Sequence, residues 1–462
     1  MRLRHGAVAI AAVLLVTVGR ASFAEGDVEA PPFMALLSRV CVDEPIFSGL
    51  VCVFEANKGA ARTVVLVHGI NGSVADWSNQ ISALAARFHV VAIDLPGFGA
   101  STRANVLYSV DRYADVLDFV IRRYASGRVS LVGHSLGGAI VLWYAGNHSD
   151  RIDRVVVADV PGVLHRLSLA KHHGGGWLEK WVGQPEAPGP SAVGRLLGEV
   201  LERFEWLELD PETVLQSEAA RQRVLGGDPA RISALALAAA DFSDVIAKMT
   251  VPTLILWGGR DEIATIRTGY VLAARLPSAR LVVVPGAHSP MKEHPQPFTE
   301  AMMAHLNAAD VPGRTAPPEA EPSPENQVGK CEQESHVVFT GHFDELTIRG
   351  CSDVTIRDAT VSRLDVREST VVLLKTVIRN DRVGATIVGS EVVATATDIT
   401  GDIAINVSRS RLDLAGVRLV GTTAAVAAEQ GSNVTFSVSW IESPRRRGPV
   451  HEYIEVAPGH PL

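Results

Sequence analysis

The chain has 462 residues, of which 47% are hydrophobic and 20% are charged. Such a length predicts more than one domain, and such a composition is typical of globular proteins, which excludes a mostly disordered or collagen-like chain. The 51 acidic residues outnumber the 43 basic ones, and the formal charge of -8 argues against nucleic acid as a partner.

The N-terminal segment has the order of features of a secretory signal. Arg2 and Arg4 precede the apolar run Ala7–Gly19, and a small-residue cleavage site ends at Ala24. We therefore expect residues 1–24 to be removed and the mature protein to be periplasmic or secreted. A membrane anchor is the less favoured alternative, because the run has 13 residues and a bilayer-spanning helix needs about 20.

The four cysteines fall into two local groups, Cys41 with Cys52 and Cys331 with Cys351. Disulfides persist in oxidising compartments, and four cysteines allow three pairings. Because the members of each group are close in sequence and the groups are far apart, we expect the two local bridges. Buried free thiols are the alternative if the chain is not exported. Neither group has the C-x-x-C spacing of a zinc or redox site, and no metal is expected.

Short apolar runs alternate with helical stretches between residues 48 and 303. Nearly continuous apolar runs indicate strands that are covered on both faces, and the helices between them indicate parallel crossovers. The sequence therefore predicts an α/β fold with a doubly wound, mostly parallel sheet in residues 25–310. The expected strands are Val64–Val67, Val90–Ile93, Val129–Val132, Val155–Val157, Thr253–Leu256 and Leu281–Val284.

The alternation stops over about residues 163–248, where the sequence predicts a helical cap insertion. Three tryptophans, Trp177, Trp181 and Trp206, lie within it. Clustered aromatic side chains either form a small core of the insertion or line an apolar lid over a pocket, and the sequence favours neither.

A Pro- and Glu-rich stretch, residues 311–330, predicts an extended linker to a second domain. Residues 331–462 contain a repeat that begins at a serine and has apolar residues two, four and nine places later. Stacked strand coils need this pattern, so we expect an all-β parallel β-helix that folds independently of the first domain. A β-sandwich is the alternative, although it would not require the same offsets in every repeat. The serines are Ser352, Ser369, Ser390, Ser410 and Ser432.

The segment Gly133–Gly138 reads Gly-His-Ser-Leu-Gly-Gly, directly after an expected strand and before an expected helix. G-x-S-x-G in this context forces a tight turn, in which the glycines allow close backbone approach and the serine hydroxyl is exposed above the sheet. Ser135 is therefore the candidate nucleophile.

A nucleophilic serine needs a base, and the base needs a group that holds it in the right tautomer. His288 and Asp261 each follow an expected strand. Because ligands of open α/β sheets bind at the carboxyl ends of the strands, we expect both side chains to meet Ser135 there. Asp159 also follows a strand and is the alternative acid. Asp261 is favoured by its spacing to His288 and by the glycine pair that precedes it.

These motifs resemble the α/β-hydrolase family of serine hydrolases over about residues 51–306. The family's strand-end His-Gly appears as His68-Gly69, and its D-x-P-G-x-G turn appears at residues 94–99. The resemblance implies hydrolysis of an ester, thioester, amide or related acyl bond through an acyl-enzyme, without a cofactor.

The resemblance also implies which backbone groups would stabilise the charge that develops on the substrate carbonyl oxygen. By position, the oxyanion hole would use the backbone N–H of Leu136 and that of Ile70 or Asn71. His68 and His134 flank the turns of the site, and we expect structural roles for both.

We therefore expect an exported serine hydrolase of the carboxylic ester hydrolase class (EC 3.1), similar to esterases and lipases, with a small-molecule or lipid-like acyl substrate. The β-helix would be a spacer or a module that binds a glycan or a protein partner. The alternative is a non-catalytic binding protein on the same scaffold. Loss of turnover would be expected to show as a missing member of the set Ser135, His288 and Asp261, and all three are present.

Overall fold

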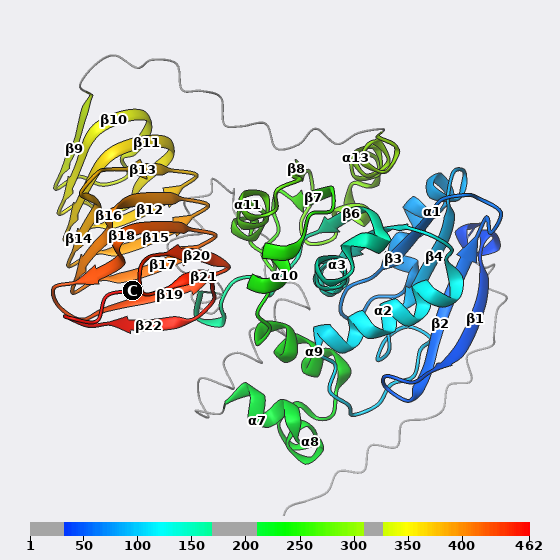
Figure 1. Cartoon of the computed structure of the whole chain (residues 1–462). Helices are drawn as coiled ribbons and strands as arrows, with labels where there is room; N and C mark the ends of the chain where they lie inside the picture. The colour runs from blue at the N-terminus through cyan, green and yellow to red at the C-terminus, as the bar shows by residue number, and fades with distance from the viewer. Residues whose placement is uncertain (1–31, 169–209, 309–326) are drawn as a thin grey trace, which may run out of the picture.

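The computed structural model describes residues 32–168, 210–308 and 327–462. These residues form two separate sheets, one of eight strands and one of fourteen, which Figure 1 shows side by side. The expected signal segment, most of the expected linker and the three tryptophans of the insertion lie outside the described residues. No helix among the described residues is long and apolar enough to cross a membrane.

The first sheet contains all six expected strands and two further strands at one edge. Its strands follow the order β1-β2-β4-β3-β5-β6-β7-β8. Pairing is parallel from β4 to β8, but β1 pairs with β2 and β2 with β4 in antiparallel fashion. The sheet is therefore mixed, with a parallel part where the site residues lie. The strands are β1 Ser38–Glu44, β2 Gly49–Ala56, β3 Thr63–Val67, β4 His89–Asp94, β5 Val129–His134, β6 Ile152–Ala158, β7 Thr253–Gly258 and β8 Ala279–Val284.

Helices cover both faces of this sheet, and β3 shows why its sequence is continuously apolar. Val65 and Val67 belong to the buried cluster that also contains side chains of α2 and α3. Val64 and Leu66 belong to the cluster on the opposite face, which contains side chains of α1 and α13. Because successive strand residues face opposite sides, a strand buried on both faces needs apolar residues at every position.

The helices of the first unit follow the chain order that the alternation predicts, and those described within the insertion, α7 to α10, lie between β6 and β7. Three of them begin with a side-chain cap, from Asp210, Ser217 and Asp228. The helices are α1 Ser78–Ala85, α2 Val110–Tyr124, α3 Leu136–Asn147, α7 Pro211–Gln216, α8 Glu218–Leu225, α9 Pro229–Ala238, α10 Ser243–Lys248, α11 Ile266–Arg275, α12 Pro290–Glu293 and α13 Pro295–Asn307, with 3-10 turns η1 Pro32–Leu36, η2 Val74–Trp77 and η3 Ser149–Arg151.

The C-terminal part is an all-β region whose strands pair mostly in parallel. The positions two places after the repeated serines are register partners from strand to strand: Val354 with Val371, Val371 with Val392, Val392 with Leu412 and Leu412 with Val434. Antiparallel pairs occur only at β19–β22 and β20–β21 among the described strands of this sheet.

The bounds of these strands are β9 Val328–Glu332, β10 Val338–Arg349, β11 Val354–Arg367, β12 Thr370–Leu374, β13 Val377–Arg379, β14 Val383–Val388, β15 Glu391–Thr395, β16 Asp398–Ser408, β17 Arg411–Ala415, β18 Arg418–Ala428, β19 Ser432–Ser437, β20 Ser439–Glu442, β21 Arg447–Val450 and β22 Tyr453–Val456.

The two local cysteine pairs are bonded. Cys41 and Cys52 are register partners on β1 and β2, and their bridge joins the antiparallel edge of the first sheet. The Cys331–Cys351 bridge joins β9 to the residue directly before Ser352, the first serine of the repeat. Each bridge therefore lies within one sheet, and neither crosses between the two parts of the chain.

Candidate active site

Ser135 lies in the tight turn between β5 and α3, with φ +53° and ψ -123°. Glycine is required at the two positions of this turn where the backbone lies against a neighbouring carbonyl oxygen. A Cβ on Gly133 would lie 2.4 Å from the carbonyl oxygen of Gly137, and a Cβ on Gly137 would lie 2.2 Å from that of Val67. The backbone N–H of Ser135 donates to Ala158 O over 2.9 Å, which ties the turn to the end of β6. The motif thus produces a strained serine, a conformation that persists only where neighbouring structure enforces it.

The structure brings the three predicted side chains together in one hydrogen-bonded chain. Nδ1 of His288 lies 2.8 Å from Oδ2 of Asp261, and Nε2 of His288 lies 3.0 Å from Oγ of Ser135. All three residues are buried, with His288 the most exposed at 9%. When Nδ1 of His288 carries the ring proton, it donates a hydrogen bond to the carboxylate of Asp261. Nε2 then carries no proton and can accept the proton of the serine hydroxyl.

The second oxygen of Asp261 is held by its own turn. Oδ1 accepts from the backbone N–H of Ile263 over 2.8 Å and from that of Ala264 over 3.1 Å. The carbonyl oxygen of Ala264 in turn accepts from the indole N–H of Trp257 on β7 over 2.8 Å. These contacts fix the carboxylate relative to the strand that precedes it.

Asp159, the alternative acid, follows β6 but does not bond to His288. Its Oδ1 accepts from the backbone N–H of Gly258 over 2.8 Å, so it supports the end of β7. Asp159 is fully buried. This burial raises the pKa of its carboxyl well above the ordinary value, and the negative charge of Asp261 raises it further. The neutral form of the Asp159 carboxyl is therefore favoured.

The expected oxyanion-hole residues lie on two segments that flank Ser135. Leu136 is the first residue of α3, where backbone N–H groups have no partner within the helix. On the other side, a Cβ on Gly69 would lie 2.9 Å from the Cβ of Ser135, so the turn that carries Ile70 and Asn71 packs directly against the serine. Asn71 adopts φ +58°, and the turn is closed by Gly72 N–H donating to Gly69 O over 3.1 Å.

The two histidines beside these turns make backbone contacts. Nε2 of His68 accepts from the N–H of Leu95 over 3.0 Å, while His134 bonds through Nε2 to the carbonyl oxygen of His288. Burial lowers the pKa of His134 to about 3, and the charge on a protonated His288 lowers it too. His134 therefore stays neutral at ordinary pH and holds the backbone of the neighbouring histidine.

Asp94 is a supporting residue whose role the sequence did not reveal. Its Oδ1 accepts from Val74 N–H over 2.7 Å and its Oδ2 accepts from Ala100 N–H over 2.8 Å, so one carboxylate joins two turns near the site. The only signal in the sequence is its place at the start of the D-x-P-G-x-G turn. Among the described residues, no cluster of three or more His, Cys, Asp or Glu side chains could hold a metal ion.

Comparison with known proteins identifies the family of this fold. A family model described as alpha/beta hydrolase fold matches residues 62–295, about half of the chain. The chain belongs to the alpha/beta hydrolase fold family. The resemblance expected from the motifs is therefore confirmed. The matched range contains Ser135, Asp261 and His288. It begins after β2 and ends at the start of α13, so membership of the family describes the parallel part of the first sheet and the helices between its strands.

The relatives of this alpha/beta hydrolase include esterases. A pimeloyl-(acyl-carrier protein) methyl ester esterase of Chromobacterium violaceum is 30% identical over 267 residues, which are 55% of this chain and 98% of the relative. An uncharacterized protein of Mycobacterium tuberculosis is 26% identical over 271 residues, or 54% of this chain and 77% of that protein. Among solved structures, a hydrolase from Pseudomonas aeruginosa is 25% identical with a TM-score of 0.44, covering 59% of this chain and 98% of its own.

Proposed function

We propose that this hydrolase cleaves an ester or a related acyl bond through an acyl-enzyme on Ser135. The observation that carries the proposal is the continuous chain of hydrogen bonds from the Ser135 hydroxyl through His288 to Asp261. A nucleophile, a base within reach of it and a group that orients the base are the three parts that acyl transfer by serine requires.

The proposed reaction has two halves. Nε2 of His288 takes the proton of Ser135 as Oγ attacks the substrate carbonyl carbon, and the same proton then passes to the leaving group as the acyl-enzyme forms. In the second half, His288 takes a proton from water as the water oxygen attacks the acyl-enzyme. The proton then returns to Oγ of Ser135, and the carboxylic acid is released. The N–H of Leu136 and that of Ile70 or Asn71 would donate to the oxyanion in both steps.

The proposed substrate is a carboxylic ester (EC 3.1) of a small or lipid-like acyl group. The support is that the relatives include a methyl ester esterase that the chain covers almost fully. In hydrolases generally, the side chains that line the acyl-binding site decide which chain lengths are accepted. A series of p-nitrophenyl esters of rising acyl length measures that selectivity directly.

The test of the proposed function compares Ser135→Ala with Ser82→Ala, an exposed serine on α1. Ser135→Ala should reduce kcat by about 10⁶-fold, because nucleophile and base act as one unit. It should also abolish labelling by a fluorophosphonate, whereas Ser82→Ala should retain both. Unchanged turnover in Ser135→Ala would refute the assignment. A wild-type protein that neither turns over any ester nor accepts the label would favour the binding-protein alternative.

We also propose that the protein is exported and that its C-terminal region is a short parallel β-helix. Two local disulfides support export, because such bonds persist in oxidising compartments. The in-register parallel stacking of β12, β15, β17 and β19 supports the β-helix. Mass spectrometry of protein secreted by its host should find an N-terminus at Glu25, and a retained residue 1 would contradict cleavage.

A further inference from the structure

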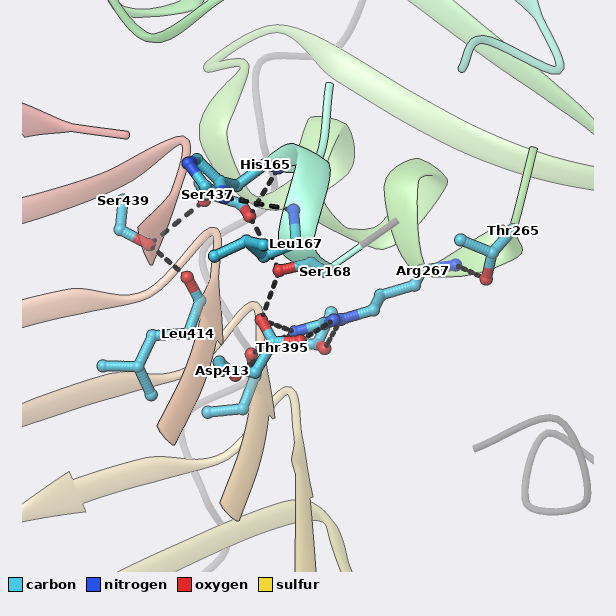
Figure 2. Close-up of polar contacts among 11 residues, drawn as sticks. His165, Leu167, Ser168, Thr265, Arg267, Thr395, Asp413, Leu414, Ser437 and Ser439 are labelled. Atoms are coloured by element: carbon cyan, nitrogen blue, oxygen red, sulfur yellow. Dashed lines mark hydrogen bonds and ion pairs between the residues drawn. The ribbon is translucent and has the colours of Figure 1, made fainter. Parts of the chain in front are cut away.

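A buried ion pair joins the C-terminal all-β region to the hydrolase domain (Figure 2). Arg267, near the start of α11, is 7% exposed, and Asp413, in β17, is 4% exposed. Nη1 of Arg267 donates to Oδ2 of Asp413 over 2.9 Å, and Nη2 donates to Oδ1 over 3.0 Å. This paired geometry is the most directional contact that a guanidinium makes with a carboxylate.

Nε and Nη2 of the guanidinium make further hydrogen bonds to the β region. Nε of Arg267 donates to Thr395 Oγ1 over 2.9 Å. Nη2 donates in addition to the carbonyl oxygens of Ala394 and Asp413, each over 3.2 Å. Buried ion pairs offset the cost of desolvation only when their partners are complete and well placed, and removing one partner is strongly destabilising. The pair therefore fixes how the two parts of the chain fit together.

The same carboxylate also holds the start of the cap insertion. Oγ of Ser168, a residue that is 3% exposed, donates to Oδ1 of Asp413 over 2.9 Å. Close by, the backbone N–H of His165 donates to Oγ of Ser437 over 2.8 Å. Figure 2 shows these contacts on the same side of the second sheet as Arg267. Asp413 thus binds two segments of the hydrolase domain at once.

Both segments lead directly to the candidate site. Thr265 caps α11 by accepting from the N–H of Arg267 over 3.2 Å, and the turn before it is bonded to the carboxylate of Asp261. The segment that carries Ser168 leaves the end of β6 after Asp159, and β6 pairs with β7, the strand before Asp261. Hydrogen bonds and short stretches of the chain between them therefore connect Asp413 to Asp261.

We propose that Asp413 is a positioning residue: by holding Arg267 and Ser168, it fixes the turn that carries Asp261 and the first residues of the cap insertion. The C-terminal region is then part of the catalytic unit. This inference rests on the proposed function, because it gives Asp413 a role only if Asp261 orients His288 during turnover.

The test uses full-length protein and a small ester, p-nitrophenyl acetate. Asp413→Asn and Arg267→Met should each lower kcat about tenfold to a hundredfold, the cost of a small misplacement of a reacting group, with little change in KM. The matched control is Arg275→Gln. Arg275 lies at the other end of α11 and forms an ion pair of 3.1 Å with Asp398 across the same interface. Its loss should leave kcat unchanged.

A double variant separates positioning from stability. Arg267→Met with Asp413→Leu replaces the ion pair by apolar side chains, an exchange that is often neutral or stabilising. We expect its thermal midpoint to recover while kcat stays low, because the fixed guanidinium geometry is gone. Recovery of kcat together with the midpoint, or full activity in folded Asp413→Asn, would overturn the positioning role. If Asp413→Asn does not fold, Arg267→Lys makes the same comparison, since it keeps the charge but loses the paired geometry.

Ser135→Ala is measured beside these variants. Turnover that survives in Ser135→Ala would overturn the proposed function and this role with it. Turnover that depends on Ser135 but is unaffected by the changes at Asp413 and Arg267 would overturn the positioning role alone.

Discussion

Two buried carboxyl groups follow neighbouring strands of the parallel sheet, and their hydrogen-bond partners give them different roles. Asp261 bonds to Nδ1 of His288 and accepts from two backbone N–H groups, those of Ile263 and Ala264. Asp159 accepts one backbone N–H, and its burial favours the neutral form. Position along the chain does not distinguish these residues, since each lies close after the end of a strand. Their partners do.

Asp261→Asn should lower kcat by about 10⁴-fold, because an amide can no longer fix the tautomer of His288 or stabilise its protonated form. The fold should persist, as measured by circular dichroism. Asp159→Asn is the matched control: the amide resembles a neutral carboxyl and can still accept from Gly258 N–H, so its kcat should stay near that of the wild type. The reverse result would mean that Asp159 is the acid.

The pH dependence of stability offers a second measurement on Asp159. A carboxyl whose pKa is raised on folding stabilises the folded state below its ordinary pKa, and that contribution is lost as the pH rises toward the folded-state pKa. The amide that Asp159→Asn introduces does not titrate. The thermal midpoint of Asp159→Asn relative to wild type should therefore increase between about pH 4, near the ordinary pKa of aspartate, and pH 8. A difference that stays constant across this range would mean that Asp159 is ionised in the folded protein.

The side chains of the candidate site could be predicted because each belongs to a local pattern. Ser135 lies within its glycine motif, and Asp261 and His288 each follow a strand that its own residues define. The contact of Arg267 with Asp413 could not be predicted in this way. The two residues are separated by 146 positions, and each is an ordinary charged residue in its local sequence.

At the scale of the element, the repeated serines of the second sheet form a ladder along one corner. The N–H of Ser369 donates to Ser390 Oγ over 3.1 Å, that of Ser390 to Ser410 Oγ over 3.1 Å and that of Ser410 to Ser432 Oγ over 3.2 Å. The residues immediately before Ser369, Ser390 and Ser410 have positive φ, which turns the chain from one strand to the next. The sequence repeat therefore marks the turn that precedes β12, β15 and β17.

Ser390→Ala should destabilise the C-terminal region by about 1–3 kcal/mol, because it leaves the buried N–H of Ser369 without its acceptor. The control is Ser352→Ala. Ser352 has the same place in the repeat but is exposed, so loss of its hydroxyl should have little effect on stability. Chemical denaturation followed by far-ultraviolet circular dichroism measures both. Equal effects of the two changes would show that the hydroxyl ladder does not stabilise the corner.

The parallel strands could be predicted from their apolar runs, whereas the antiparallel edge could not. The side chains of β1 are mostly exposed, so the strand lacks a continuous apolar run. The Cys41–Cys52 bridge joins its register partners on β1 and β2 and crosslinks this edge. Only long-range pairing with β4, through β2, places the edge in the sheet.

At the scale of the whole molecule, the two parts of the chain pack against each other, and whether each folds independently stays a prediction. A Pro- and Glu-rich connection predicts separation, yet the buried apolar cluster of the hydrolase domain includes Ala415 and Val438 of the β region. A Cβ on Gly416 would lie 3.1 Å from Val271, so the backbones approach closely at α11. Lys375 adds a contact, with its ammonium 4.5 Å from the centre of the Tyr270 ring. Neither the composition of the connection nor the spacing of the repeat predicts these contacts between the two parts of the chain.

Cleavage of the connection tests whether this interface holds the two parts together. A protease site inserted within residues 311–326 would divide the chain without touching either sheet. Because each disulfide lies within one part, no covalent bond would remain between the fragments. Two bands on a non-reducing denaturing gel should therefore accompany a single peak at the uncut elution volume in gel filtration. Buried ion pairs are screened weakly by salt, so this peak should persist at high ionic strength. Separate elution of the fragments at low salt would show instead that the connection, and not the interface, keeps the β region beside the hydrolase domain.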